Sequence, residues 1–549
     1  MTTGTDTCSL NGVPIRAMTR GQSPGIVRSG NYAWVSLRAG AAAGAAAGTA
    51  LCFYQYFGPL NYVGLSLMWP LIAINLLVGM VTGAASLSAW RRVKWVGPAL
   101  GLATTLSVTG FWGAANVRHD AEVVLYVTDA VRADHLSAYG HGRDTSPALQ
   151  ALAKEPQGVL FRQAIAQGTY TWGGTPAILA SIYPSMCDIT LEAGLSDRAV
   201  TIPQPLKLSG YSTFGISANP HISREKHFDR GFDSFEDCLR WEDVPRADAL
   251  NHAFLKWLGS AARGSRTFGF IFTTDAHGPY SPDVKALRRY RPRFNLPLPV
   301  PLAIFNAPSA DQRSDLVALY DASIRSVDAA VGKLLSALRK QRRLDNTLFI
   351  FTADHGEAWW EHGEVGHGGT PYEEVIRIPL IMHFPSPVRF PRIHPSQRQP
   401  NWQVGQIDIM PTILDFVGSD RKIAAMRGKS LLPYLFGRLT PPSERGLLSE
   451  SKPGGAWYRS WRRSGWKYLA FYHTGVQDPD APSAERLFSI VRDPKELRDV
   501  GSRDPKRRRQ YRQEMVSEVR AAQRFSMKPS AARLSPEALR RLKSLGYVK

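Results

Sequence analysis

The sequence predicts an α/β protein built on a mainly parallel central sheet. Three short apolar runs are typical of buried parallel strands: residues 123–127, 267–273 and 347–352. Between the second and third runs, the amphipathic segment 310–339 indicates a long helix. An aspartate follows each run, at Asp129, Asp275 and Asp354. Because ligands of such sheets bind at the carboxyl ends of the strands, these aspartates predict a site there.

The remaining elements follow from shorter signals. After the first strand, Ser146 is placed to cap a helix and Pro147 to occupy its first position. Residues 457–473 and 487–490 indicate short antiparallel strands, which predict a small α+β subdomain at residues 441–549. A basic run at residues 503–512 allows a helix with a solvated face.

The N-terminal region contains three uncharged stretches: residues 39–57, 60–90 and 95–117. Each reaches the ~20 residues that span ~30 Å of hydrocarbon, so residues 39–117 predict three transmembrane helices. Arginines precede the first stretch, and basic residues separate the second from the third. The positive-inside rule then places residues 1–38 in the cytoplasm. We expect a multi-pass protein of the inner or plasma membrane, with residues 118–440 and 441–549 on the periplasmic or extracellular side. Buried helices of a soluble domain are the alternative.

Composition limits the partners of the 549-residue chain. With 67 Lys+Arg against 46 Asp+Glu, its net charge of +21 suits anionic lipid or an anionic substrate, although a solvated basic surface explains it equally. No recognition motif accompanies the charge, so nucleic acid is not expected as a partner. The four cysteines form no CxxC pair, which argues against a zinc finger. Cys187 and Cys238 either form one disulfide or remain two free thiols.

Carboxylates and imidazoles gather after the predicted strands. Asp354 and His355 are adjacent, and Asp129 supplies a further oxygen, so that these side chains can reach one divalent cation. His367 follows twelve residues later in a Gly-flanked loop, and His277 lies after the second strand.

Five segments carry a family resemblance: VVLYVTDAVRADHLSAYGHGRDTSPALQALAKE, GFIFTTDAHGPYSP, FIFTADHGEAWWEHGEVGHGGTPYEEVIRIPLIMHFP, VGQIDIMPTILDFVG and LFSIVRDPKELRDV. They resemble segments of sulfatase-family enzymes and occur in that family's order from about residue 123 to about residue 500. The resemblance implies an alkaline-phosphatase-like sandwich and one divalent metal ion: Ca²⁺, Mn²⁺, Mg²⁺ or Zn²⁺. Its implied ligands are Asp129, Thr171, Asp354 and His355.

The resemblance also implies the roles of other residues. Thr171 takes the nucleophile's position, counted back from the Tyr-Pro pair that ends TPAILASIYP, and Thr169 and Thr175 are its rivals. His277 and His367 are implied to contact the transferring group or to protonate the leaving oxygen. The implied substrate-binding residues are Asp275 and Lys467.

The departures from the family pattern carry information. Formylglycine-dependent sulfatases have Cys or Ser followed by Pro and Arg, whereas residues 171–175 are Thr-Trp-Gly-Gly-Thr, so formylglycine is not expected. Ala130 replaces the second Asp of the usual pair. The Thr-containing ligand set also resembles phosphoethanolamine transferases and nucleotide phosphodiesterases. A Thr alkoxide can attack phosphorus, but a sulfated Thr lacks the exit that a formylglycine hydrate provides, which favours a phosphoester.

We therefore expect a membrane-anchored, metal-dependent hydrolase of sulfate or phosphate esters. One alternative is a transferase that moves a phosphoethanolamine- or phosphoglycerol-like group onto an envelope glycan or lipid. The other is a catalytically inactive receptor or scaffold, which Ala130 and the missing Arg motivate. The identity of the metal and the oligomeric state are left open.

Overall fold

The computed structural model describes residues 121–549, with the exception of residues 263, 281, 295, 298–299, 301–304, 306–307, 387–391, 477 and 546–549. The described residues all belong to one compact unit. The predicted transmembrane helices, together with Cys8 and Cys52, lie outside the described residues. Within the described part of the chain, no helix combines the length and the apolar character that a membrane crossing requires.

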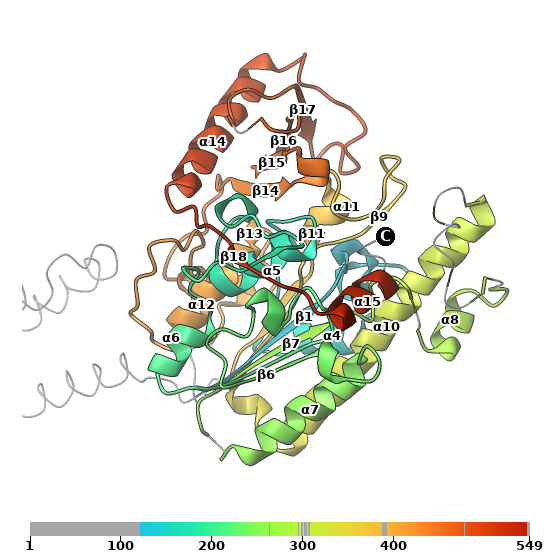
Figure 1. Ribbon diagram of the computed structural model, residues 1–549, viewed down its shortest axis with the longest axis vertical. Coiled ribbons are helices and arrows are strands. Elements are labelled where there is room, and N and C mark those ends of the chain that lie inside the picture. Colours follow the sequence, from blue (N-terminus) through green and yellow to red (C-terminus); the bar gives the residue numbers. More distant parts are fainter. Residues whose placement is uncertain are drawn as a thin grey trace, which may run out of the picture. The chain divides into compact units, whose positions relative to one another are not determined.

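A seven-stranded sheet with the order β2-β12-β8-β1-β7-β5-β6 forms the centre of this unit (Figure 1). Its strands are β1 (Glu122–Thr128), β2 (Gly158–Leu160), β5 (Ser212–Ser217), β6 (Ser234–Asp237), β7 (Thr267–Thr273), β8 (Thr347–Ala353) and β12 (Leu380–His383). Five of them, from β8 to β6 in the sheet order, are parallel, and β12 is antiparallel to both of its neighbours. The sheet is therefore mainly parallel, as predicted.

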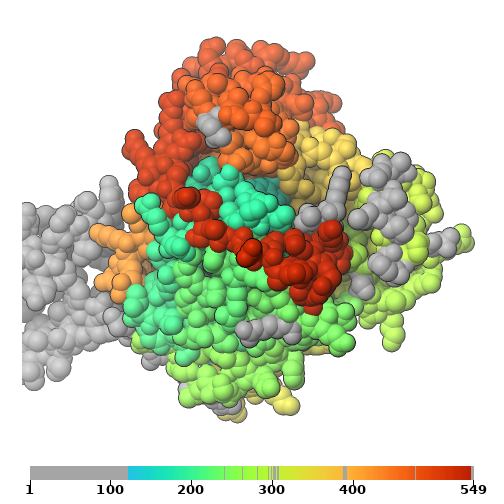
Figure 2. Space-filling model, viewed as in Figure 1, coloured from blue at the N-terminus to red at the C-terminus, as the bar shows by residue number. Residues whose placement is uncertain are grey.

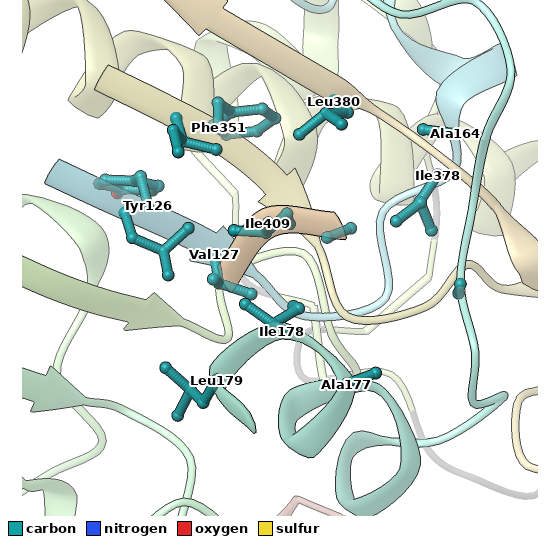
Figure 3. Packing of buried hydrophobic residues seen from close by; sticks show 14 of the residues in the cluster. Tyr126, Val127, Ala164, Ala177, Ile178, Leu179, Phe351, Ile378, Leu380 and Ile409 are labelled. Atoms are coloured by element: carbon teal, nitrogen blue, oxygen red, sulfur yellow. The ribbon is translucent and has the colours of Figure 1, made fainter. Parts of the chain in front are cut away.

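Helices cover both faces of this sheet, since every residue of β1, β7 and β8 is buried. The helices are α4 (Pro147–Lys154), α5 (Thr171–Ala180), α6 (Pro203–Leu208), α7 (Ala247–Ser260), α8 (Val284–Tyr290), α10 (Ala310–Lys340), α11 (Glu373–Ile376), α12 (Ile409–Phe416), α13 (Leu432–Leu435), α14 (Pro505–Gln523) and α15 (Pro536–Ser544). Figure 3 shows side chains of β1 and β8 in one hydrophobic cluster with those of α5 and α12. The predicted long helix is α10, which begins in a capping box between Ser309 and Gln312.

The start of α4 differs from the prediction in one detail. Pro147 is its first residue and Ser146 stands at the cap position, but the Ser146 side chain makes no capping hydrogen bond. The first N–H groups, from Ala148 and Leu149, instead donate to the carboxylate of Asp328 on α10, at 3.0 and 2.9 Å. A buried carboxylate on a neighbouring helix thus satisfies the helix start, and this contact cannot be inferred from local sequence.

The C-terminal part forms a smaller antiparallel sheet with the order β14-β15-β16-β17. Its strands are β14 (Leu447–Ser451), β15 (Tyr458–Arg463), β16 (Trp466–Phe471) and β17 (Ala484–Ser489). Helix α14 packs on this sheet and contains residues 505–512 of the predicted basic run. The Arg507 guanidinium lies 3.9 Å from the centre of the Trp466 ring. The chain then returns to the main domain, where β18 (Ser530–Ala531) pairs with β4 (Ala193–Gly194). Figure 2 shows this last segment, in red, crossing the surface of the main domain.

The remaining short strands brace loops around the central sheet. They are β3 (Ala164–Ile165), β11 (Arg377–Ile378) and β13 (Val404–Gly405), which pair together, and β9 (Ala358–Trp359) with β10 (Val365–Gly366). Cys187 and Cys238 are buried and free, so the two-thiol alternative is the one that the structure contains.

Candidate active site

The ends of two neighbouring strands bring the predicted metal ligands together. Asp129 follows β1, Asp354 and His355 follow β8, and the two strands pair in parallel up to Thr128 and Ala353. One ligand atom from each of Asp129, Asp354 and His355 lies within 4.8 Å of the others, and all three residues are fully buried. The His355 Nε2 atom is 3.5 Å from Asp129 Oδ1 and 3.4 Å from Asp354 Oδ2.

Neighbouring groups fix the orientation of these side chains. The Ala130 and His355 backbone N–H groups donate to Asp354 Oδ1, at 3.1 and 2.9 Å. The His355 Nδ1 atom lies 2.8 Å from Gly356 O, and donation of its N–H to that carbonyl leaves Nε2 with a lone pair. The Asn219 side-chain amide donates to Asp129 Oδ2 at 2.7 Å. Each ligand is therefore held by a second partner, as metal ligands commonly are.

The electrostatics of the site suit a divalent cation. Burial, and then the charge of Asp129, raise the pKa of Asp354 well above its usual range. Burial lowers the pKa of His355 to about 3, which keeps its imidazole neutral. Within the described residues, Asp354 Oδ2, His355 Nε2 and Thr171 Oγ1 are buried without a hydrogen-bond partner. Two adjacent carboxylates, a neutral imidazole and a hydroxyl therefore fit the metal that the resemblance implies.

Thr171 is the first residue of α5 and is 2% exposed. Its hydroxyl lies close enough to the Asp354 carboxylate to lower the pKa of that carboxyl, against the larger effect of burial, which raises it. Gly174 permits this approach, because a Cβ atom there would lie 2.1 Å from the backbone oxygen of Asp354. Of the rivals, Thr169 donates its hydroxyl to Gly369 O at 3.4 Å, and Thr175 lies one turn further along α5. Thr171 therefore lies beside the Asp354 carboxylate, which is the position that the predicted nucleophile needs.

The two predicted catalytic histidines lie beside this group. The ring centres of His277 and His367 are 5.0 Å apart, and those of His367 and His355 are 4.3 Å apart. Burial lowers the pKa of His277. Burial also acts to lower the pKa of His367, but the charge of Glu357 and its contact with His367 Nδ1 at 3.1 Å raise it above the usual value. His277 thus favours the neutral form, and His367 beside it favours the protonated form.

The two predicted substrate-binding residues, Asp275 and Lys467, have partners within the protein. The Asp275 carboxylate accepts hydrogen bonds from the Ala247 backbone N–H at the start of α7, at 2.9 Å, and from the Thr273 hydroxyl, at 2.5 Å. The Lys467 ammonium is fully buried, 2.8 Å from Glu496 Oε1 and 3.4 Å from Glu373 Oε1. Both residues thus make contacts that hold the fold, and their contact with a substrate stays a prediction.

Three residues near the site were not among the predicted site residues. Asn219 and His221 follow the end of β5, where the same strand-end rule that identified Asp129 would have found them. The His221 ring lies 4.1 Å from the Trp172 ring, between centres, and burial lowers the pKa of His221 well below its usual value. Glu357 belongs to the motif after β8, but its contact with His367 is visible only in the fold.

The fold and this centre define a candidate metal-dependent ester hydrolase. The Sulfatase family model matches residues 121–419, and the chain belongs to the sulfatase family.

Individual relatives agree with this assignment. The chain is 31% identical over 198 residues to arylsulfatase K of Canis lupus familiaris, and the alignment covers 34% of each protein. It is 31% identical over 235 residues to an endo-4-O-sulfatase of Bacteroides thetaiotaomicron, covering 41% of this chain and 42% of the relative. The matched segments thus span less than half the length of these relatives. The solved phosphonate monoester hydrolase of Agrobacterium radiobacter superposes with a TM-score of 0.56 at 20% identity, covering 75% of this chain and 100% of that chain. This likeness shows a shared fold.

Proposed function

We propose that this chain is a membrane-anchored, metal-dependent ester hydrolase in which Thr171 carries the transferred group covalently. The supporting observation is the meeting of Asp129, Asp354 and His355 at the ends of β1 and β8, beside the first residue of α5. Asp129, Thr171, Asp354 and His355 would hold one divalent ion. Such an ion, when bound, supplies charge neutralisation and lowers the pKa of a hydroxyl that contacts it.

The residues of the chain then account for two displacement steps. With its proton already lost to solvent, because the bound ion would lower the pKa of the hydroxyl, the Thr171 oxygen forms a bond to phosphorus or sulfur while the bond to the leaving oxygen breaks. His277 or His367 gives a proton to that leaving oxygen, a task suited to an imidazole near neutral pH. A water oxygen next forms a bond to phosphorus or sulfur while the bond to Thr171 breaks and leaves the threonine oxygen as an alkoxide, and the proton that the water releases returns to the imidazole. The positive end of the α5 dipole lies at Thr171 and favours negative charge there.

Phosphorus is the preferred centre. Residues 171–175 lack the formylglycine motif, and a sulfated threonine has no easy route to hydrolysis, whereas a phosphothreonine can pass its group to water. The substrate class is therefore an anionic phosphoester, with a sulfate ester as the second choice.

Chromogenic substrates of four classes test this proposal: a phosphodiester, a phosphonate monoester, a phosphomonoester and an aryl sulfate. We expect the full chain, supplied with divalent metal, to hydrolyse at least one phosphorus ester faster than the sulfate. Thr171→Val should lower the rate by roughly 10³-fold or more, and Thr175→Val, the matched control on the same helix, should stay near the wild-type rate. Trapped phosphothreonine at Thr171 would identify the intermediate by mass spectrometry. Useful hydrolysis of the sulfate alone, or an active Thr171→Val variant, would overturn the proposal.

An acceptor alcohol added to the same assay tests for the transferase. Turnover that requires the acceptor and transfers the phospho-group to it would support that alternative.

We further propose that residues 39–117 anchor the catalytic domain outside the cytoplasm, where an envelope glycan or lipid ester is the available substrate. The three uncharged stretches and the flanking basic residues support this orientation. Leu208 is 67% exposed, so Leu208→Cys should react with a membrane-impermeant thiol reagent on intact cells. Cys8 should react only after permeabilisation. Protection of both cysteines in intact cells would contradict the orientation.

A further inference from the structure

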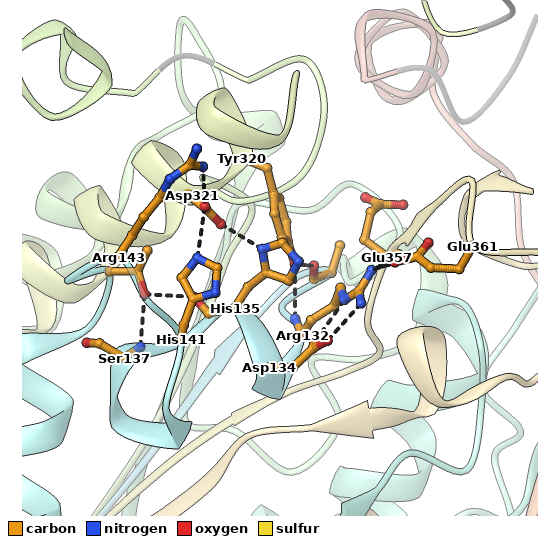
Figure 4. Close-up of polar contacts among 12 residues, drawn as sticks. Arg132, Asp134, His135, Ser137, His141, Arg143, Tyr320, Asp321, Glu357 and Glu361 are labelled. Atoms are coloured by element: carbon orange, nitrogen blue, oxygen red, sulfur yellow. Dashed lines mark hydrogen bonds and ion pairs between the residues drawn. The ribbon is translucent and has the colours of Figure 1, made fainter. Parts of the chain in front are cut away.

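A second cluster of metal-ligating side chains lies outside the proposed active site (Figure 4). His135 and His141 come from the segment between β1 and α4, and Asp321 comes from α10. The His135 Nδ1 atom is 2.6 Å from Asp321 Oδ1, and the His141 Nε2 atom is 3.0 Å from Asp321 Oδ2. One ligand atom from each of the three residues lies within 4.8 Å of the others.

Three nitrogen groups converge on one buried carboxylate. The Asp321 side chain is fully buried, and the Arg143 guanidinium, with Nη1 2.6 Å from Oδ2, already supplies the one positive charge that a carboxylate needs. The two imidazoles nevertheless stack with their ring centres 5.0 Å apart, and each directs one nitrogen at the same carboxylate. Two imidazoles and a carboxylate that share one centre are a common ligand set for metals.

We propose that His135, His141 and Asp321 form a second divalent-cation site. Two nitrogen donors and one oxygen donor suit Zn²⁺ and similar transition-metal ions better than Ca²⁺ or Mg²⁺, which prefer oxygen ligands. Ligand bonds of ~2.1 Å in a tetrahedral site place neighbouring ligand atoms roughly 3.4 Å apart, so His135 Nδ1 and Asp321 Oδ1, which are 2.6 Å apart, separate by about 0.8 Å when the ion binds. The His141 side chain is 21% exposed, which gives the ion access. Arg143 remains the outer partner that orients the carboxylate.

An ion at this site would clip the segment after β1 to α10. Tyr320, the neighbour of Asp321, donates its hydroxyl to Ala130 O at 2.7 Å and accepts a hydrogen bond from the Arg132 backbone N–H at 3.0 Å. Both partners belong to the turn that follows Asp129. The second site thus stabilises the turn that carries a ligand of the first, and its role is structural.

Metal stoichiometry tests this inference. The full chain in detergent is stripped with a chelator, titrated with Zn²⁺ alone and analysed for bound metal and for thermal unfolding. We expect two ions per wild-type chain, and one in His135→Gln/His141→Gln, in which glutamine keeps a hydrogen-bond donor for Asp321. The double variant should also lose part of the Zn²⁺-dependent rise in Tm. His252→Gln, which changes an exposed histidine on α7, is the matched control and should bind two ions.

A complementary variant keeps the test decisive if the first fails to fold. Asp354→Asn/His355→Gln removes two ligands of the first site and should retain one ion. When Co²⁺ replaces that ion, the visible absorption spectrum should show imidazole ligation. Binding of no ion by this variant would refute the inference. So would the retention of two ions by a folded His135→Gln/His141→Gln protein, or a single wild-type ion that this folded double variant still binds, and the cluster would then be an ion-pair network only.

Discussion

Gly174 controls how closely α5 approaches the end of β8, and so where Thr171 lies. An alanine at this position would place its Cβ 2.1 Å from the Asp354 oxygen, 2.8 Å from the carbonyl carbon and 3.2 Å from Cα. All three atoms are backbone, so no side chain can rotate away. Because such contacts are not made below 3.0 Å, the helix and the strand end must separate by about 1 Å.

This displacement has a predictable cost. Overpacking of a well-packed core typically costs about 1–3 kcal/mol of stability. A misplacement of ~1 Å between a nucleophile and its site can lower a rate by ~10²-fold. We therefore expect Gly174→Ala to fold with a lower Tm, to bind metal more weakly and to hydrolyse the best phosphoester about 100-fold more slowly.

The matched control is Gly259→Ala on α7, where the added Cβ meets no atom within 4 Å. That substitution should gain up to ~1 kcal/mol from the better helix propensity of alanine, with an unchanged rate. Calorimetric Tm, bound metal and steady-state rates would be compared among the wild type and the two variants. Wild-type metal content and activity in Gly174→Ala would refute the placement of α5 against Asp354.

Three further predictions concern other parts of the molecule. Asn219→Ala removes the hydrogen bond to Asp129 and should weaken metal binding ~10–100-fold in a chelator competition, whereas unchanged affinity would show that Asn219 does not position the ligand. Burial raises the pKa of Asp328 to about 6, above its ordinary 3.8, so the folded state favours the protonated carboxyl. The free energy of unfolding that this contributes is fully present below pH 3.8 and is lost as the pH rises through about 6. The stability of the wild type relative to Asp328→Asn should therefore fall by about 3 kcal/mol between pH 4 and pH 7 in denaturant titrations, and parallel pH profiles would contradict this. Lys467→Met leaves Glu373 and Glu496 without their shared cation and should cost ~3–5 kcal/mol, with partial recovery in Lys467→Met/Glu496→Gln. A raised KM with unchanged stability would instead make Lys467 a substrate residue.

The central strands were predictable because burial on both faces leaves a direct trace in the sequence. The runs in β1, β7 and β8 are apolar and rich in β-branched and aromatic residues, and their observed ends lie within one residue of the predicted ones. Parallel neighbours end at the same edge of a sheet, which is why Asp129, Asp354 and His355 could be grouped before any coordinates were known.

The same rule could not separate ligands from residues that hold the fold. Asp275 follows a buried strand in the same way as Asp129, but its carboxylate meets the start of α7, an element that sequence does not place. Lys467 stands on β16, and only the fold shows that two carboxylates enclose it. The helix cap supplied by Asp328 has the same origin, since its partners lie about 180 residues earlier in the chain. Long-range polar contacts of this kind leave no periodic signal.

Ala130 stands where the resemblance implies the second aspartate of a pair, and its backbone helps to orient Asp354. Its φ of 58° places a non-glycine residue in the left-handed region, at a cost of about 1 kcal/mol. Two hydrogen bonds hold this conformation. The Ala130 N–H donates to Asp354 Oδ1, and the Ala130 carbonyl accepts from the Tyr320 hydroxyl. Because two backbone N–H groups already engage Oδ1, the Oδ2 atom is the one left for a metal. The resulting set has few oxygens and one imidazole nitrogen. Because Ca²⁺ takes six to eight oxygen ligands, we expect Zn²⁺ or Mn²⁺ to bind this set more tightly than Ca²⁺, which a metal titration of the wild type would check.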